Sequence, residues 1–233
     1  AITFVAFVIL FMAPGNEMRV ASEITTWMPG YKELSVGNHL FMTIQWMLSS
    51  FANEGKAFFI AIWAAGFLLL VKSKKAKVYQ SLAVVFSVVA LLPYAGISFF
   101  SEMGIGYIDI EQCLMELPTW QSMTTQNRIA FFWWIAAVLF TLVLLWKVTG
   151  HSVFISMVFL GGIASEAVLY FSPTIYASGA RVYYLTDLMY LFIILWMVMR
   201  MDSEKKKNLF IAGAAALGII NFLSQYSIML LKL

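Results

Sequence analysis

The sequence is poor in charge and in cysteine, and each shortage excludes a class of protein. Only 12% of its 233 residues are charged, and the formal net charge is +3. Because soluble domains have about a quarter of their residues charged, a soluble globular fold is excluded. The single cysteine, Cys113, rules out an intrachain disulfide. The basic residues stand in short runs beside apolar segments, so no nucleic-acid partner is predicted.

Motifs for nucleotides and for catalytic metals are missing too. The sequence has no phosphate-cradling P-loop, no G-x-G-x-x-G and no H-E-x-x-H, so ATP-driven transport by this chain alone has no support. His39 and His151 are predicted on opposite sides of a membrane and cannot share a metal. Asp109 and Glu111, on an outer loop, could hold a divalent cation through oxygen ligands, although two acids in a loop are usually just solvated. No other cofactor is predicted.

What the sequence has is apolar residues, at 62% of the chain, and a mean hydropathy of +0.85. A soluble protein of this size could not bury so much apolar surface, so the class is integral membrane protein. None of the apolar runs alternates like a membrane β-strand, so they are predicted to be α-helices. Residues 1–233 then form one all-α polytopic transmembrane bundle of about seven spans. The runs are Ala1–Met12, Ala57–Val71, Val78–Ile97, Ile129–Trp146, Val153–Phe171, Val182–Met199 and Leu209–Leu231.

The first of these runs is short. A spanning helix needs about 20 residues, and Ala1–Met12 ends at Pro14-Gly15. The chain also starts without Met and without the basic region of a signal peptide. We therefore expect the chain to be the C-terminal fragment of a larger protein, with its first span truncated.

The positions of lysine and arginine predict the orientation. Three turns carry nine of the 15 basic residues: the Lys72–Lys77 turn, the turn at Lys147 and the Arg200–Lys207 turn. Alternating spans put all three turns on one side, and basic loops mark the cytoplasmic side. The protein is therefore predicted in the bacterial plasma (inner) membrane, with the long acidic loops outside. Within the outer region, Val36–Phe51 has an apolar stripe at helical spacing and is predicted to be an interfacial helix on the outer leaflet.

Two acids fall inside predicted spans. Glu166 lies about five residues before the outer end of its helix, and Asp187 about five residues into the next, so both would sit about 7 to 8 Å below the outer surface. Asn221 and Gln225, spaced i, i+4, would add polar groups at similar depth. This shared depth predicts a polar pocket open to the outside. Alternatively, either acid could pair with Arg181 or reach the interface, and the two amides could bind neighbouring helices.

Two short motifs resemble a known family. The first follows a helix as P-G-N-x-x-R, and the second combines S-P with a later arginine after G-G-I-A-S-E. The matching residues are Pro14, Gly15, Asn16 and Arg19, then Ser172, Pro173 and Arg181. Together they resemble uncharacterised bacterial polytopic membrane proteins that are similar to glycosyltransferases of the GT-C class. Such enzymes use polyprenyl-phosphate-linked sugars at the outer face of the membrane.

The resemblance implies roles for several residues. Asn16, Arg19 and Arg181 would bind the phosphate of the lipid-linked donor, since arginine holds phosphate through a bidentate charged fork. Glu166 and Asp187 would orient these arginines or the sugar hydroxyls, with Asn221 and Gln225 as further supporting groups of the pocket. GT-C enzymes carry their catalytic acid on a first outer loop, which this chain lacks, so the catalytic residue is unknown. Alternatively, Arg19 and Arg181 simply anchor to bulk headgroups.

The sequence-based hypothesis is therefore a glycosyltransferase-like protein of cell-envelope glycan or lipid modification, with a lipid-linked sugar donor and the lipid bilayer as partners. Two alternatives stay open. A polytopic transporter or flippase would also carry intramembrane acids, and a non-catalytic scaffold of envelope assembly would need no pocket chemistry.

Overall fold

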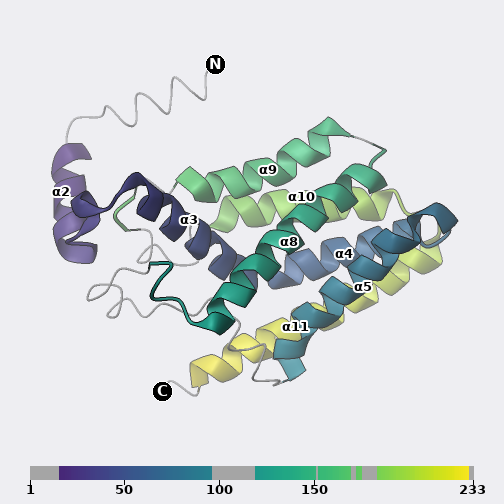
Figure 1. The fold of residues 1–233 in the computed structure, drawn as a ribbon. Helices are drawn as coiled ribbons and strands as arrows, with labels where there is room; N and C mark the ends of the chain where they lie inside the picture. The colour runs from purple at the N-terminus through teal and green to yellow at the C-terminus, as the bar shows by residue number, and fades with distance from the viewer. Residues whose placement is uncertain (1–15, 96–118, 151, 169–171, 175–182, 231–233) are drawn as a thin grey trace.

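The computed structural model describes residues 16–95, 119–150, 152–168, 172–174 and 183–230 (Figure 1). Within these ranges the chain is helical and has no strand, which confirms the all-α class. Short 3-10 turns connect some of the helices. The α-helices are α2 (Asn16–Trp27), α3 (Val36–Ser50), α4 (Lys56–Leu70), α5 (Lys77–Leu91), α8 (Thr125–Val148), α9 (Val153–Ala167), α10 (Tyr184–Met199) and α11 (Glu204–Leu230).

The helices from α4 onward coincide with the predicted apolar runs. Among the described residues, two segments are long and apolar enough to cross a membrane by length and composition: Asn127–Val148, with a mean hydropathy of 2.4, and Glu204–Leu223, with 1.2. The remaining four apolar helices, α4, α5, α9 and α10, are shorter, at 15 or 16 residues each. The run Ala1–Met12 lies outside the described residues.

Capping residues explain where α3 and α8 begin and where α8 ends. The hydroxyl of Ser35 accepts the backbone N–H of Asn38, and Thr124 does the same for Asn127. Side-chain oxygens at these positions satisfy N–H groups that the first helical turn leaves without partners. After α8, Gly150 adopts a φ of +66°, a left-handed conformation that costs glycine little.

Helix α4 lies at the centre of the bundle, where it contacts α5, α8, α10 and α11. Its side chains Phe59 and Trp63 are fully buried, and the Trp63 indole N–H donates to the Thr141 hydroxyl of α8 at 2.8 Å. The two helices are in close contact at Gly66, where a Cβ atom would lie 2.7 Å from a methyl carbon of Leu144. Glycine at position 66 therefore sets the separation of α4 and α8.

The basic turns meet at one end of the bundle. Lys72, after α4, and Lys206, in α11, bind the two carboxylate oxygens of Asp202 at 2.7 and 2.9 Å. These lysines hold the pKa of Asp202 well below its ordinary value. Lys147, at the end of α8, lies 6.0 Å from the ring centroid of Tyr79 in α5. The prediction that these three turns share one side is confirmed (Figure 1).

The structure corrects the prediction of a separate surface helix at residues 36–51. Helix α3 continues through a π-helical turn, Phe51–Gly55, directly into α4. Its second half packs against α8 and α9, so that Gln45 is 5% exposed although the stripe predicts it away from the buried side. The first half keeps Leu40 exposed. Periodicity located the helix but did not show that its end belongs to the bundle.

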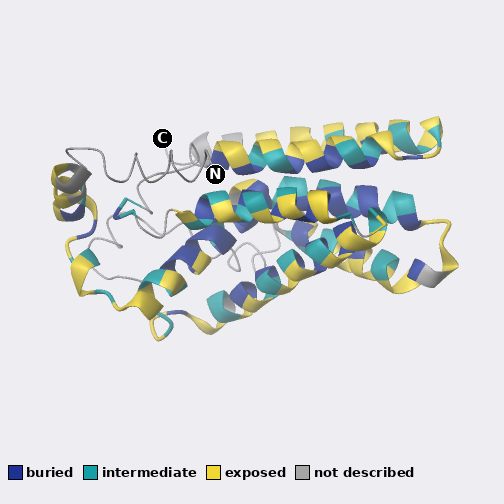
Figure 2. Ribbon diagram, turned by 90° about the horizontal axis from the view of Figure 1, so that it is seen from above, coloured by how far each residue is buried: buried dark blue, intermediate teal, exposed yellow. Residues whose placement is uncertain are grey.

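Many large apolar side chains are exposed on the outside of the bundle. Figure 2 shows exposed residues along the outer faces of the helices. Helix α11 is the extreme case, because only 11% of its apolar window is buried. Exposed residues along it include Leu209, Ile211, Ile219, Phe222 and Leu223. Continuous apolar surface of this kind is typical of a face covered by lipid or by another protein.

Candidate functional site

Glu166 is the most deeply buried acid among the described residues. It lies near the end of α9 and is 1% exposed. The hydroxyl of Ser50, the last residue of α3, donates to Glu166 Oε2 at 2.9 Å and also lies 2.8 Å from the carbonyl oxygen of Met47. A serine hydroxyl has one proton, so it cannot serve both acceptors at once. No ion pair to Glu166 is present within the part of the chain that the structure describes.

Glu166 shares a small cavity with two further acids. The cavity is about 10 Å³ in volume, which is room for about one water molecule. Asp187 on its lining is partly exposed, and Glu54 is exposed. The described residues that line it are Ser50, Phe51, Glu54, Gly55, Glu166, Tyr183, Thr186, Asp187 and Tyr190. The site therefore combines three acids, four side chains with a hydroxyl group and three aromatic rings, two of which are the rings of tyrosines.

Tyr190 is a buried residue of this cavity whose hydroxyl group is not hydrogen-bonded within the described part of the chain. It is 1% exposed and packs against Phe51, Phe59 and Phe159 with ring centroids 5.5 to 6.5 Å apart. Its hydroxyl has no hydrogen-bond partner among the described residues. Buried hydroxyls are nearly always hydrogen-bonded, so this atom is available to a ligand or to water.

A hydrogen-bonded contact between α9 and α10 positions the acids. Thr186 donates to the carbonyl oxygen of Gly162 at 3.1 Å, and its hydroxyl lies 3.0 Å from that of Ser165. A Cβ atom at Gly162 would lie 3.3 Å from a ring carbon of Tyr190. Small residues allow helices to come this close in membranes, and here the close approach brings Glu166 and Asp187 to one cavity.

The π-helical turn supplies the other wall. It follows Ser50 and includes Phe51, Glu54 and Gly55, all of which line the cavity. A π-turn inserts an extra residue into a helix and is frequent at functional sites. Because the turn separates α3 from α4, it directs Ser50 and Glu54 toward the same space from one continuous helical segment.

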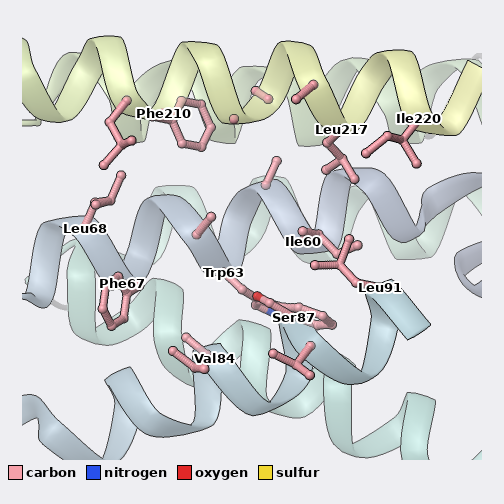
Figure 3. A pocket seen from close by; sticks show the side chains of 18 residues that line it. Ile60, Trp63, Phe67, Leu68, Val84, Ser87, Leu91, Phe210, Leu217 and Ile220 are labelled. Carbon is pink, nitrogen blue, oxygen red and sulfur yellow. The ribbon is translucent and has the colours of Figure 1, made fainter. Parts of the chain in front are cut away.

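A second hollow lies along the bundle, between α11 and the pair α4 and α5 (Figure 3). It is an apolar groove of about 510 Å³. Side chains from the three helices face one another across it, as Figure 3 shows for Phe67 of α4, Val84 of α5 and Leu217 of α11. We call it the α4–α5–α11 groove. A hydrocarbon chain is the kind of ligand that such a lining favours.

A polar cluster stands at one end of this groove. Ile60, Leu91 and Ile220 line that end, which is the end away from Leu68 and the basic turns. Lys56, one turn before Ile60, places its Nζ 4.4 Å from the ring centroid of Tyr94. The Tyr94 hydroxyl in turn donates to Asn221 Oδ1 at 2.6 Å. The groove is therefore apolar along its length, and Lys56 stands near its far end without lining it.

The acidic cavity and the polar end of the groove are connected by one short stretch of the sequence. Glu54 lines the cavity and Lys56 stands at the end of the groove, two residues later. Asn221, predicted to share the acidic pocket, instead belongs to the groove end. The structure thus brings Glu166 and Asp187 together and separates Asn221 from them.

The remaining residues that the sequence predicts for the site lie partly or wholly outside the described part of the structure. Asn16 and Arg19 fall on α2, and Gln225 on α11, but the placement of their side chains lies outside the described residues. Arg181, with the candidate cation ligands Asp109 and Glu111, lies outside them altogether. Within the described part, no group of three or more histidine, cysteine or acidic side chains is arranged to hold a metal.

Sequence reasoning missed several residues of the site: Ser50, Glu54, Lys56, Thr186, Tyr183 and Tyr190. Glu54 and Lys56 could have been noticed in the sequence, since they are the charged residues in a stretch from Phe51 to Val71 that is largely apolar. Tyr190 had none, because an aromatic residue in an apolar helix is ordinary. Comparison with family models, with curated proteins and with solved structures gives no match to this chain.

Proposed function

We propose that the chain is a multi-pass protein of the bacterial plasma membrane, in which the apolar helices from α4 to α11, together with Ala1–Met12, provide about seven spans. Support comes from the exposed apolar faces, above all on α11. The basic turns meet at one end of the bundle, and basic turns mark the cytoplasmic side. The acidic cavity and the polar end of the groove then face outward.

Within that membrane, we propose that the protein is glycosyltransferase-like and uses a polyprenyl-phosphate-linked sugar at the outer face to modify a cell-envelope glycan or lipid. The observation that carries the proposal is a set of three features: an apolar groove, a cation near its outer end, and an acidic cavity whose Glu54 lies two residues before that cation in the chain. A lipid-linked sugar has a corresponding set of parts, namely hydrocarbon, phosphate and hydroxyls.

Each part of the site then has a role. The α4–α5–α11 groove holds the hydrocarbon chain, and Lys56 lies near the phosphate. Glu54 and Asp187 are accessible at the cavity and accept hydrogen bonds from sugar hydroxyls, while Glu166 supports the cavity from beneath. The resemblance adds Asn16, Arg19 and Arg181 to the phosphate, where they would stabilise the leaving group as charge develops. None of the cavity acids is assigned as the catalytic base.

A test is sugar transfer by the full-length protein in proteoliposomes, with a panel of polyprenyl-phosphate sugars as donors. Transfer is expected, with at least a tenfold loss for Asp187→Asn, because hydrogen bonds to charged groups contribute about 1.5 kcal/mol or more. Asp202→Asn is the matched control, since it makes the same change at the opposite end of the bundle. A protein that transfers no sugar from any donor refutes the proposal.

One observation favours a second candidate, a transporter or flippase. Glu166 is buried at 1% exposure and has no ion-pair partner in the described ranges, and buried acids in membranes often carry protons during transport. Uptake of a labelled substrate into proteoliposomes that is abolished by Glu166→Gln, in the absence of any transfer activity, would select this function.

A further inference from the structure

The acidic cavity has no basic side chain among the described residues that line it. Glu54, Glu166 and Asp187 all belong to that lining. Lys56 lies close enough to interact electrostatically with Glu54, but its ammonium group is placed against the ring of Tyr94, 4.4 Å from the ring centroid. Acids that share a small space repel one another when ionised, so a bound cation would stabilise all three.

The aromatic lining favours an organic cation over a metal ion. Phe51, Tyr183 and Tyr190 surround the cavity together with the acids, and aromatic faces attract ammonium groups. The described residues hold no cluster of three ligating side chains suited to a metal. An ammonium group does not need such a cluster, because it donates three separate hydrogen bonds.

Tyr190 provides independent support for a ligand that donates hydrogen bonds. Tyr190 lines the same cavity, and its buried hydroxyl has no hydrogen-bond partner among the described residues. Ionised carboxylate groups can only accept hydrogen bonds, so the three acids cannot donate one to the Tyr190 oxygen. An ammonium group would donate to the Tyr190 oxygen and to the acids at the same time.

The size of the cavity limits what enters it. About 10 Å³ admits one group the size of a water molecule, which excludes a whole sugar ring but matches a primary ammonium group. The rest of the ligand must then remain outside, beside Glu54, which is the exposed acid of the site.

We propose that this cavity binds the primary ammonium group of a ligand whose larger part stays at the cavity mouth. Two sources carry that chemistry: an amino sugar and the ethanolamine headgroup of a lipid. The assignment to an amino sugar rests on the proposed glycosyltransferase function and narrows its donor to sugars with a free amine. The ammonium site itself does not depend on that function.

The experiment measures equilibrium binding to the full-length protein in phosphatidylcholine nanodiscs, which contain no ethanolamine. The probes are glucosamine, N-acetylglucosamine, glucose and ethanolamine. Glucosamine is expected to bind at least tenfold more tightly than N-acetylglucosamine, which has the same ring without the charge. Tyr190→Phe removes only the hydroxyl and keeps the ring packing, and it is expected to weaken glucosamine binding about tenfold. Asp187→Asn should weaken it as well, whereas Asp202→Asn should leave it unchanged.

The outcomes separate this inference from the proposed function. Ethanolamine binding that depends on Tyr190 and Asp187, without glucosamine binding, supports the ammonium site and identifies a lipid headgroup as its source. Equal binding of the three sugars, or no binding of either amine, overturns the inference. In that case, transfer of a neutral sugar from a polyprenyl-phosphate donor would leave the proposed function standing.

Discussion

The hydrogen bond between Ser50 and Glu166 joins α3 to α9 and can be tested by one substitution. Ser50→Ala removes the hydroxyl that donates to Glu166 Oε2 at 2.9 Å and changes little else. Glu166 is 1% exposed, so water does not readily replace the lost donor. The buried carboxyl group then loses its hydrogen bond from Ser50 and keeps a weaker one with Thr186.

The expected cost follows from that burial. A buried polar group that loses its partner costs about 1–3 kcal/mol, and more if it is charged. In a Glu166→Gln background, the side chain at 166 is neutral, so Ser50→Ala should cost about 1 kcal/mol less than it does in the wild type. The double-mutant cycle thus reports the interaction itself and not the general effect of removing a hydroxyl.

The assay is unfolding of the full chain in detergent micelles, followed by circular dichroism for the four members of the cycle. Ser156→Ala is the matched control, because Ser156 is a buried serine of α9 whose hydroxyl donates within its own helix, to Ser152, at 3.2 Å. It should change stability by less than about 0.5 kcal/mol. If Ser50→Ala costs no more than Ser156→Ala, or if the coupling to Glu166 is zero, the reasoning about this site is refuted.

Two further predictions concern packing and charge. Gly66→Ala should destabilise the protein by about 1–2 kcal/mol, because the new methyl meets Leu144 at 2.7 Å and overpacking of about 1–3 kcal/mol exceeds the gain in helix propensity. Gly213→Ala, where nothing lies within 4 Å, should instead be neutral or stabilise by up to about 1 kcal/mol, and equal effects in thermal unfolding would contradict this. Hydrogen bonds from Lys72 and Lys206 lower the pKa of Asp202. This interaction contributes stability that is present above the unfolded pKa of about 3.9 and is lost as the pH falls below it. The melting temperatures of wild type and Asp202→Asn should therefore converge as the pH falls below about 4, and a constant difference would disprove the linkage.

The sequence was sufficient for the positions of the apolar helices and for the common end of the basic turns. Both follow from properties that add up over many residues, namely hydrophobicity over a helix and the placement of lysines in turns. Both predictions remain correct when a few individual residues depart from the pattern. This is why the Lys72–Asp202 contact agrees with a prediction made from charge counts alone.

The candidate site depends on single residues, and there the sequence was less informative. The shared depth of Glu166 and Asp187 was enough to expect them near each other. Asn221, at similar depth, accepts from Tyr94 instead, because depth says nothing of direction around the bundle. Ser50 and Glu54 were missed because the π-helical turn shifts the helical phase after α3. A pattern with a constant period of 3.6 residues cannot register such a shift.

The distribution of polarity indicates why the cavity, and not another part of the bundle, is the candidate site. Most buried polar side chains have partners close by: Thr141, for example, accepts from Trp63 and donates to a carbonyl of its own helix. Among the described residues, two buried side-chain atoms lack a partner, Arg128 Nε and Tyr190 Oη. The Arg128 guanidinium is otherwise held, since it donates to the carbonyl of Trp120 at 3.1 Å and stacks on that ring. Tyr190 has no such substitute among the described residues, and it lines the cavity that three acids share, so a ligand bound there would satisfy a buried polar group.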